Sequence, residues 1–314
     1  MTALDFLSPD EGWIAVQRPP GSTPQGAIAG TTDGGRHWRT LVRWTGTPPW
    51  HFPYSDGPLV PTALDFVDPQ HGWALVPLGG GACQAEFGVL RTSDGGAQWL
   101  PAGVLLGSDG PVSLAFGTRQ VGWVSNGSCA GAYTSVSAST DGGTAWRPWS
   151  RWYPASPDAA LAPTATALGA ASATHAWMVN AYWNYAAPAP HAPVLQALTT
   201  DDGGTTWTGH LLPTSGLAGR IAALGFLTPD VGWVVTAQGS RTTLAGTLDA
   251  GRHWQTLALP GPSGTVGPVD RVTIQVGYAV QTLPPTLHAP AGSSRLWVTD
   301  DGGRSWQPVA LPEP

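Results

Sequence analysis

The sequence has little charge. Charged residues make up 11% of the 314 positions, and all 14 basic residues are Arg, because Lys is absent. The Arg residues are scattered singly and the formal net charge is −6. A basic stripe for phosphate groups is therefore missing, and we expect no nucleic-acid partner. No apolar run approaches the ~20 residues that cross a bilayer, so we expect no membrane-spanning segment.

Residues that hold metals and cofactors are also scarce. The two cysteines, Cys83 and Cys129, are too few for a disulfide framework and lack the spacing of a metal site. The eight His include no H-x-x-x-H pair, and the Gly-Gly pairs belong to repeated turns rather than to a phosphate loop. We expect neither metal nor cofactor. No signal peptide precedes Ala3, so we expect an exported protein to be represented here in processed form.

Turn-forming residues and tryptophan are abundant. The chain contains 42 Gly, 31 Pro and 17 Trp, and 42% of it is hydrophobic. Gly and Pro together make up about 12% of an average protein, and this chain has nearly twice that share. Disorder is excluded because disordered chains have few aromatic residues. The composition predicts a turn-rich β-protein.

One octet with the consensus [ST]-x-D-[GA]-G-x-x-W recurs six times at intervals of 47 to 61 residues. Its copies are TTDGGRHW (31–38), TSDGGAQW (92–99), STDGGTAW (139–146), TDDGGTTW (200–207), TLDAGRHW (247–254) and TDDGGRSW (299–306). A second motif precedes each octet: an alternating apolar run, a polar turn, then Gly-Trp opening another run, as in ALDFLSPDEGWIAV (3–16). The last copy, RVTIQVGYAVQ (271–281), is degenerate.

Each repeat reads as four short antiparallel strands, which is the unit of a β-propeller blade. We predict an all-β chain folded as a single propeller over 1–314, with six four-stranded blades and seven as the alternative. The approximate blades are 1–57, 58–108, 109–160, 161–216, 217–264 and 265–314. We expect a monomer.

The octet is expected where the third strand turns into the fourth. Its Asp can accept main-chain N–H groups across the turn, its Gly tolerates positive φ, and its Trp can seal one blade against the next. Eleven of the 17 Trp occupy repeat positions. We therefore assign a structural role to the octet residues Asp33, Asp94, Asp141, Asp202, Asp249, Asp301, Trp38, Trp99, Trp146, Trp207, Trp254 and Trp306.

The octet resembles the Asp-box, or BNR, repeat of sialidases, sortilin-type receptors and xyloglucan-hydrolysing propellers. The longer pattern, F-x-x-x-x-x-G-W through T-x-D-G-G-x-x-W, is similar to the photosystem II assembly and stability factor group, and it covers nearly the whole chain. This resemblance implies a propeller, often with seven blades. It implies little about function, because unrelated activities share the blade.

Aromatic residues gather in connections expected on the face opposite the octets. These are Trp44, Trp50, Phe52, Tyr54, Trp149, Trp152, Tyr153, Tyr182, Trp183 and Tyr185. Exposed aromatic clusters suit protein anchoring or stacking on sugar rings. They could instead pack against one another to hold long loops still, and the sequence leaves these alternatives open.

Cys83 and Cys129 are expected in the second-to-third-strand loops of adjacent blades, where a disulfide is geometrically plausible. If it forms, it implies an oxidising compartment, meaning the periplasm, the cell surface or the medium.

Catalytic carboxylates are few. The three Glu residues, Glu11, Glu86 and Glu313, do not suit the Tyr–Glu pair of a sialidase. Asp5 and Asp65, at matching positions of adjacent innermost strands, are weak candidates for a hydrolytic pair; Ala115, Gly169, Gly225 and Thr273 occupy the other four positions. We predict a non-catalytic binding scaffold of the cell envelope or exterior, engaging a protein partner. A carbohydrate-binding or glycan-hydrolysing propeller is the alternative.

Overall fold

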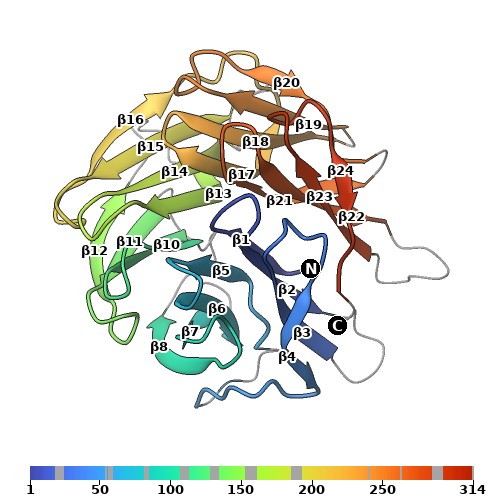
Figure 1. Cartoon of the computed structure of the whole chain (residues 1–314). Helices are drawn as coiled ribbons and strands as arrows, with labels where there is room; N and C mark the ends of the chain where they lie inside the picture. Colours follow the sequence, from blue (N-terminus) through green and yellow to red (C-terminus); the bar gives the residue numbers. More distant parts are fainter. Residues whose placement is uncertain are drawn as a thin grey trace.

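The computed structural model describes residues 1–17, 25–53, 55, 59–80, 85–106, 113–127, 134–152, 161–184, 193–239, 241–261, 264–284 and 293–312. Over these ranges it has 24 strands and no helix. They form six four-stranded antiparallel sheets, each built from four consecutive strands. The sheets surround a common axis as the blades of a propeller (Figure 1). The prediction of an all-β propeller with six blades is confirmed.

The innermost strands of blades 1 to 3 are short, with four residues each. Blade 1 contains β1 (Ala3–Phe6), β2 (Gly12–Gln17), β3 (Gln25–Thr31) and β4 (Arg39–Thr45). Blade 2 contains β5 (Ala63–Phe66), β6 (Gly72–Gly79), β7 (Glu86–Thr92) and β8 (Leu100–Leu106). Blade 3 contains β9 (Ser113–Phe116), β10 (Gly122–Gly127), β11 (Thr134–Ser139) and β12 (Arg147–Trp152).

Blades 4 to 6 have longer innermost strands. Blade 4 contains β13 (Leu161–Ala170), β14 (Ala176–Asn184), β15 (Val194–Thr200) and β16 (Thr208–Leu212). Blade 5 contains β17 (Arg220–Thr228), β18 (Val231–Gln238), β19 (Arg241–Thr247) and β20 (Gln255–Leu257). Blade 6 contains β21 (Thr265–Arg271), β22 (Gly277–Leu283), β23 (Ser293–Thr299) and β24 (Gln307–Val309).

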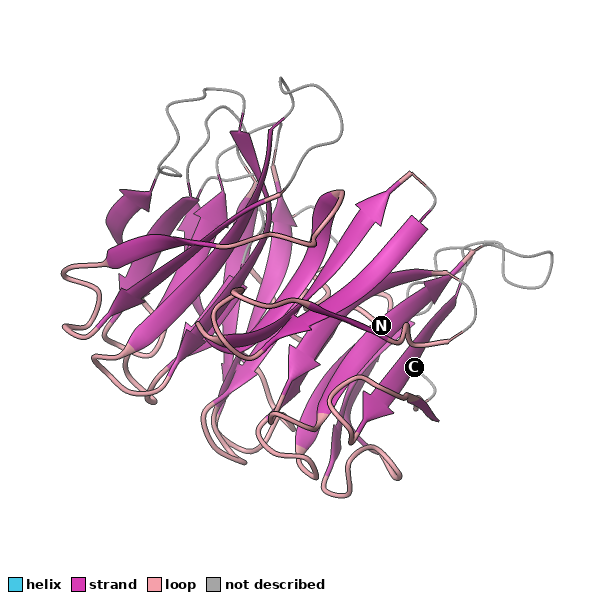
Figure 2. Ribbon diagram, turned by 90° about the horizontal axis from the view of Figure 1, so that it is seen from above, coloured by secondary structure: helices cyan, strands magenta, loops and turns pink. Residues whose placement is uncertain are grey.

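The turns between the first and second strands and the octets lie on one face, here called the octet face. In blade 1 the Gly34 N–H of the octet donates to the Asp10 carbonyl of the first turn at 2.8 Å, and the other five blades have the equivalent bond. These compact turns form the lower edge of Figure 2. The other ends of the strands lie on the opposite face, here called the loop face.

Each octet is held by the same hydrogen bonds. In blade 1 the Thr31 hydroxyl donates to Asp33 Oδ1 at 2.9 Å and accepts the Gly35 N–H at 2.9 Å. Asp33 Oδ1 also accepts the His37 N–H at 2.8 Å. The corresponding groups of the other five octets repeat this pattern. The expected turn chemistry therefore fixes the Asp of each octet at the point where the chain reverses.

The core consists of six apolar clusters, one at each blade interface. At the interface of blades 1 and 2, Trp13 stacks on Phe66 with ring centroids 3.7 Å apart, and its Nε1–H donates to the Gly95 carbonyl at 3.0 Å. Trp73 and Phe116 repeat this stack between blades 2 and 3. Such aromatic pairs contribute about 1 kcal/mol beyond the area that they bury.

The ring of blades closes between blades 6 and 1, where Tyr278 takes the place of the Trp. Its ring stacks on Phe6 at 3.6 Å, and its hydroxyl donates to the Pro9 carbonyl at 3.0 Å. Burial raises the pKa of Tyr278, so its hydroxyl remains protonated and keeps this bond. Within the described part of the chain, no helix is long and apolar enough to cross a membrane.

Candidate functional site

Three aspartates line the central channel at the same position of their innermost strands. Asp5 pairs with Trp13, Asp65 with Trp73 and Asp270 with Tyr278 across the first strand pair of blades 1, 2 and 6. From the sequence we expect Thr273 at this position of blade 6. That expectation is wrong, because β21 ends at Arg271 and Asp270 is the residue in register.

The spacing of the repeat contained the signal for Asp270. Asp5 and Asp65 each stand eight residues before the Trp of their blade, and Asp270 stands eight residues before Tyr278. The motif could not be aligned through its Phe, since Arg271 stands where Phe6 and Phe66 stand in blades 1 and 2. Blade 6 had therefore to be aligned backward from Tyr278.

The channel carboxylates connect neighbouring blades. Asp5 Oδ2 accepts the Phe66 N–H at 2.7 Å, and Asp65 Oδ2 accepts the Phe116 N–H at 2.7 Å. The Phe6 N–H likewise donates to Asp270. The cavity between them has a volume of about 220 Å³ and is lined by all six innermost strands.

These carboxyl groups border the cavity, but the surrounding protein keeps them from bulk water. Burial raises the pKa of Asp65 and that of Asp270 to about 7. Burial also raises the pKa of Asp5 well above its usual value, and the nearby Asp65 and Asp270 carboxylates add to that rise. The Asp270 Oδ2 atom is buried and has no hydrogen-bond partner within the described part of the chain. Asp65 and Asp270 are thus predominantly protonated below neutral pH.

Much of the predicted aromatic surface lies in the core. Trp44, Trp50, Phe52 and Tyr182 are all buried, so these four follow the alternative of internal packing rather than that of an exposed binding surface. Trp183 is half-buried, and Trp149 and Trp152 belong to β12. Tyr54, Tyr153 and Tyr185 lie outside the described residues.

The first of these aromatic groups forms a folded cap over the loop face, made by residues 46–53, 55 and 59–60 between β4 and β5. The Trp50 Nε1–H donates to the Leu59 carbonyl at 2.9 Å, and the Trp50 ring meets Trp44 edge to face at 5.1 Å. Phe52 packs over Gly88, where a Cβ would lie 2.4 Å from its ring. Pro48, Trp50 and Phe52 are buried, alternating with the exposed Thr47, Pro49, His51 and Pro53.

Tyr182 connects blades 3 and 4 in a similar way. Its hydroxyl lies 3.2 Å from that of Thr134 and donates to Gln196 at 3.4 Å. Burial raises the pKa of Tyr182 to about 12. Tyr182 belongs to β14, and its side chain lies between two blades. From the sequence alone this position could not be distinguished from one in a loop.

The octet aspartates are charged turn residues on the octet face. Main-chain and side-chain hydrogen bonds from His37 lower the pKa of Asp33 to about 2, and bonds from the His253 side chain and main chain lower that of Asp249 to about 2. The pKa of Asp141, Asp202 and Asp301 is lowered as well. Their carboxylates therefore remain ionised, and their oxygens accept hydrogen bonds within the turn.

The octet tryptophans sit at the blade interfaces with different exposures. Trp99 and Trp207 are buried, and Trp38, Trp146, Trp254 and Trp306 are partly covered. Trp38, Trp99 and Trp146 each meet the Phe of their own blade edge to face.

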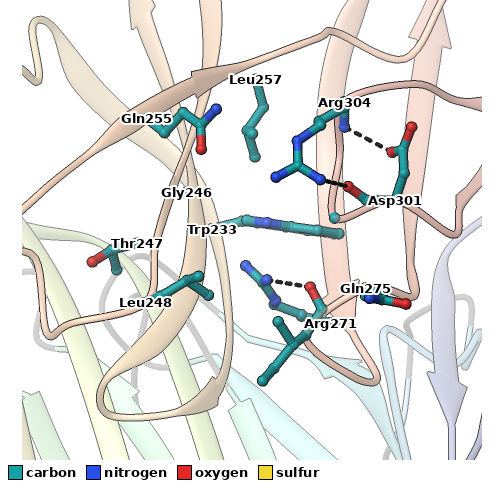
Figure 3. Close-up of a pocket in the computed structure, with 12 residues that line it drawn as sticks. Trp233, Gly246, Thr247, Leu248, Gln255, Leu257, Arg271, Gln275, Asp301 and Arg304 are labelled. Carbon is teal, nitrogen blue, oxygen red and sulfur yellow. Dashed lines mark hydrogen bonds between the residues drawn. The ribbon is translucent and has the colours of Figure 1, made fainter.

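A further pocket opens on the octet face between blades 5 and 6 (Figure 3). It has a volume of about 160 Å³, and Trp233 forms its wall, with Arg271 and Arg304 directed toward the ring. None of these three residues is among the candidate site residues predicted from the sequence. Cys83 and Cys129 lie outside the described residues, and the described residues contain no group of three or more His, Cys, Asp or Glu arranged to hold a metal.

Neither a protein-family profile nor a curated protein matches the sequence. Among solved structures, a mutant α-L-arabinofuranosidase arb93a from Fusarium graminearum, in complex with an iminosugar inhibitor, is similar over 95% of this chain and 92% of its own, with 12% identity and a TM-score of 0.61. An α-L-arabinanase from Penicillium chrysogenum, in complex with arabinobiose, has 13% identity, coverages of 95% and 92%, and a TM-score of 0.60. YCF48 from Cyanidioschyzon merolae has 17% identity, coverages of 98% and 84%, and a TM-score of 0.47. The two enzymes share the propeller fold with this chain, and at these identities their likeness shows the fold alone.

Proposed function

We propose that this chain is a non-catalytic binding propeller that engages a protein partner through its loop face. The observation that carries the proposal is the cap between β4 and β5. The Trp50 side chain packs against Trp44 and hydrogen-bonds to the Leu59 carbonyl inside the cap. The outer surface of the cap is therefore held in one conformation in the absence of a partner. Pre-organised surfaces bind more tightly because less conformational entropy is lost on association.

The outer surface of the cap suits a protein more than a sugar. Its exposed residues are Thr47, Pro49, His51 and Pro53. Trp50, which the sequence analysis considered as a sugar platform, is 1% exposed and cannot stack on a ring without unfolding the cap. Trp149, Trp152, Trp183, Tyr54, Tyr153 and Tyr185 remain proposed contacts in addition to the cap.

The channel carboxylates support a non-catalytic role in a second way. Asp5 and Asp65, the two candidate catalytic residues, each use an oxygen to hold the next blade at 2.7 Å. Only the other oxygen of each carboxyl group could then face a substrate as a nucleophile or general base. The resemblance to the photosystem II assembly factor group and to Asp-box repeats is consistent with a binding role, and we place that role at the cell envelope or exterior.

Site-specific photocrosslinking in the source cells tests this proposal. A photoreactive phenylalanine analogue replaces His51, and the matched control carries it at Leu211, an exposed residue of β16 in blade 4. We expect one discrete protein adduct from position 51 that is absent from position 211. Equal adducts from both positions, or none from position 51, would overturn the loop-face assignment.

A glycan-hydrolysing propeller is the second candidate, and one observation favours it. The pKa of about 7 at Asp65 and Asp270 suits proton transfer at neutral pH. The test is release of reducing ends from a panel of plant and bacterial polysaccharides by the native protein and by Asp65→Asn. Sugar release that the substitution abolishes would establish this function in place of the first.

A further inference from the structure

Charge is distributed unevenly between the two faces of the propeller. Within the described ranges, the turns of the octet face contain most of the carboxylates: Asp10, Glu11, Asp33, Asp68, Asp94, Asp141, Asp201, Asp202, Asp230, Asp249, Asp300 and Asp301. Arginines are present on that face too, but they are fewer: Arg36, Arg39, Arg91, Arg119, Arg147, Arg252, Arg271 and Arg304. At the strand ends of the loop face, Glu86 is the one carboxylate that the described residues include.

Blades 5 and 6 carry exposed cations on the loop face. Arg220 begins β17, Arg241 begins β19, and Arg295 lies near the start of β23 in the adjacent blade (Figure 1). All three residues are exposed. Within the described part of the chain, no ion pair or side-chain hydrogen bond engages any of them. Their charge is therefore available to a partner. These three residues are here called the arginine surface.

The sequence around the arginine surface lacks acidic residues. The segments that join strands on the loop face from blade 4 to blade 6 are 184–194, 212–220, 238–241, 257–265 and 283–295, and they contain neither Asp nor Glu. The corresponding segments of blades 1 to 3 include Asp56, Glu86, Asp109 and Asp158. Cations without neighbouring carboxylates are thus concentrated on one half of the loop face.

Two of the three arginines face the same blade interface. Arg220 pairs with Ala237 across β17 and β18. Arg295 pairs with Gln281 across β22 and β23. Both partners stand two residues from members of the apolar cluster between blades 5 and 6, namely Val235 and Ala279. Residues two apart in a strand, and residues directly opposite in a pair, share one side of a sheet. Arg220 and Arg295 therefore point toward the same interface, near its loop-face end.

Arg241 faces the other side of blade 5, where it lines a pocket with a volume of about 200 Å³. Gln238 and Thr243 add polar groups to this pocket, and Leu217 adds an apolar one. Among the described residues, no carboxylate lines it. The space is several times the roughly 30 Å³ share of one water molecule, so it has room for an acidic side chain beside the guanidinium. Arginine favours carboxylates because its planar fork matches their two oxygens.

We propose that the arginine surface binds an acidic segment of the protein partner, an inference that rests on the loop-face function proposed above. Three arginines separated by neutral residues are fewer than the clusters of about 4–8 cations that recognise anionic membranes. They also form no continuous stripe for the phosphates of a nucleic acid. Single exposed arginines are instead common anchors of protein interfaces, and complementary charge speeds the association.

Fluorescence anisotropy titration of the intact chain tests the charge preference. The probes are labelled peptides in which Gly alternates with Glu, with Gln or with Lys, together with labelled phosphatidylserine vesicles and oligothymidine. The key variant is Arg220→Glu/Arg241→Glu/Arg295→Glu. The matched control is Arg36→Glu/Arg39→Glu/Arg252→Glu, which changes three exposed arginines of the octet face. Both variants change the net charge equally, so a difference between them reports where the charge lies.

We expect the glutamate peptide to bind with an affinity that falls as the salt concentration rises, and the glutamine and lysine peptides not to bind. The loop-face variant should weaken binding about tenfold or more, whereas the octet-face variant should leave it unchanged. Thermal unfolding should show that both variants are folded. No binding of the glutamate peptide at low salt, equal loss in the two variants, or tighter binding of vesicles or oligothymidine through the same arginines would overturn the proposal.

Photocrosslinking in the source cells separates this inference from the loop-face function itself. The photoreactive analogue is placed at His51 or at Ser293, an exposed residue at the start of β23. We expect the adduct from position 51 to be lost in the loop-face variant and kept in the octet-face variant. Mass spectrometry of the adduct from position 293 should identify a partner segment rich in Asp and Glu.

The two failures have different signatures. An adduct from position 51 that persists in the loop-face variant, or a segment at position 293 without excess acidic residues, would overturn the arginine surface and leave the loop-face function standing. Absence of the adduct from position 51 of the native chain would overturn the loop-face function, and the peptide titration then decides by itself whether the arginine surface binds acidic segments.

Discussion

Asp5 on the innermost strand of blade 1 accepts the main-chain N–H of Phe66 on the innermost strand of blade 2 at 2.7 Å. The same bond joins Asp65 to Phe116, and Phe6 donates to Asp270. Four consecutive blades, from 6 through 1 and 2 to 3, are thus connected along the channel by carboxyl groups that also repel one another when charged. Blades 3, 4 and 5 have Ala115, Gly169 and Gly225 at this position and lack such a bond.

This arrangement predicts an unusual pH dependence of stability. A carboxyl group whose pKa is higher in the folded than in the unfolded chain binds its proton more tightly when folded. The free energy of unfolding should therefore fall as the pH rises from about 4, where these carboxyl groups ionise in the unfolded chain, to about 7, where Asp65 and Asp270 ionise in the folded chain. Chemical denaturation at fixed pH values measures this slope.

Replacing Asp5, Asp65 and Asp270 together by Asn should flatten that slope, because the amide oxygen still accepts the main-chain N–H but does not titrate. Asp230→Asn, at an exposed turn of blade 5, is the control and should keep the native slope. A triple variant with the native slope would show that these carboxyls do not set the pH dependence. Below pH 4 the octets act oppositely, since stability from Asp33 and Asp249 is lost as the pH falls toward their pKa of about 2.

The cap between β4 and β5 should depend on Trp50. Replacing this buried ring by Ala removes its packing and its bond to the Leu59 carbonyl, and should lower the free energy of unfolding by about 3–5 kcal/mol. Trp50→Phe, which keeps an aromatic ring but loses the bond, should lower it by about 1–3 kcal/mol. Pro49→Ala, at the exposed neighbour, should change it by about 0.5 kcal/mol or less. Urea denaturation distinguishes these values, and a Trp50→Ala variant as stable as Pro49→Ala would contradict the packing role.

The proposed disulfide between Cys83 and Cys129 can be tested by mass. We expect the purified, unreduced chain to resist alkylation and to be about 2 Da lighter than its reduced form. The two residues are 46 positions apart, and closing a loop of that length stabilises a fold by about 4 kcal/mol, which reduction should remove. Two alkylated cysteines in the unreduced chain would refute the disulfide and remove the argument for an oxidising compartment.

The sequence was sufficient for the architecture because each blade repeats the same local chemistry. The spacing of Thr31, Asp33 and Gly35 dictates one turn, and six copies of that turn at blade-sized intervals leave little choice of fold. The exposure of Trp50 and Tyr182 could not be predicted in this way, since a connection between strands does not reveal whether its aromatic side chains point inward. The pocket at Arg271 could not be predicted for a related reason. In the sequence alone, a residue that departs from the repeat cannot be distinguished from a degenerate copy of the motif.

Blade 5 contains one departure from the repeat that should weaken the fold. Ala250 stands where the other five octets have Gly, and its φ of 58° lies in the left-handed region that a Cβ disfavours. Relief of this strain in Ala250→Gly should therefore raise the free energy of unfolding by about 1 kcal/mol. The greater flexibility of Gly in the unfolded chain should offset a smaller part of that gain.

The reverse change in blade 1 provides the matched control for Ala250. Gly34 has a φ of 72°, and a Cβ there would lie 2.8 Å from the Pro9 carbonyl oxygen, so Gly34→Ala should destabilise the chain by more than Ala250→Gly stabilises it. Differential scanning calorimetry compares the melting temperatures of both variants with that of the native chain. If Ala250→Gly lowered the melting temperature, the left-handed backbone of Ala250 would not be a source of strain. The result would mean instead that packing of the Ala250 methyl group near Trp254 stabilises blade 5.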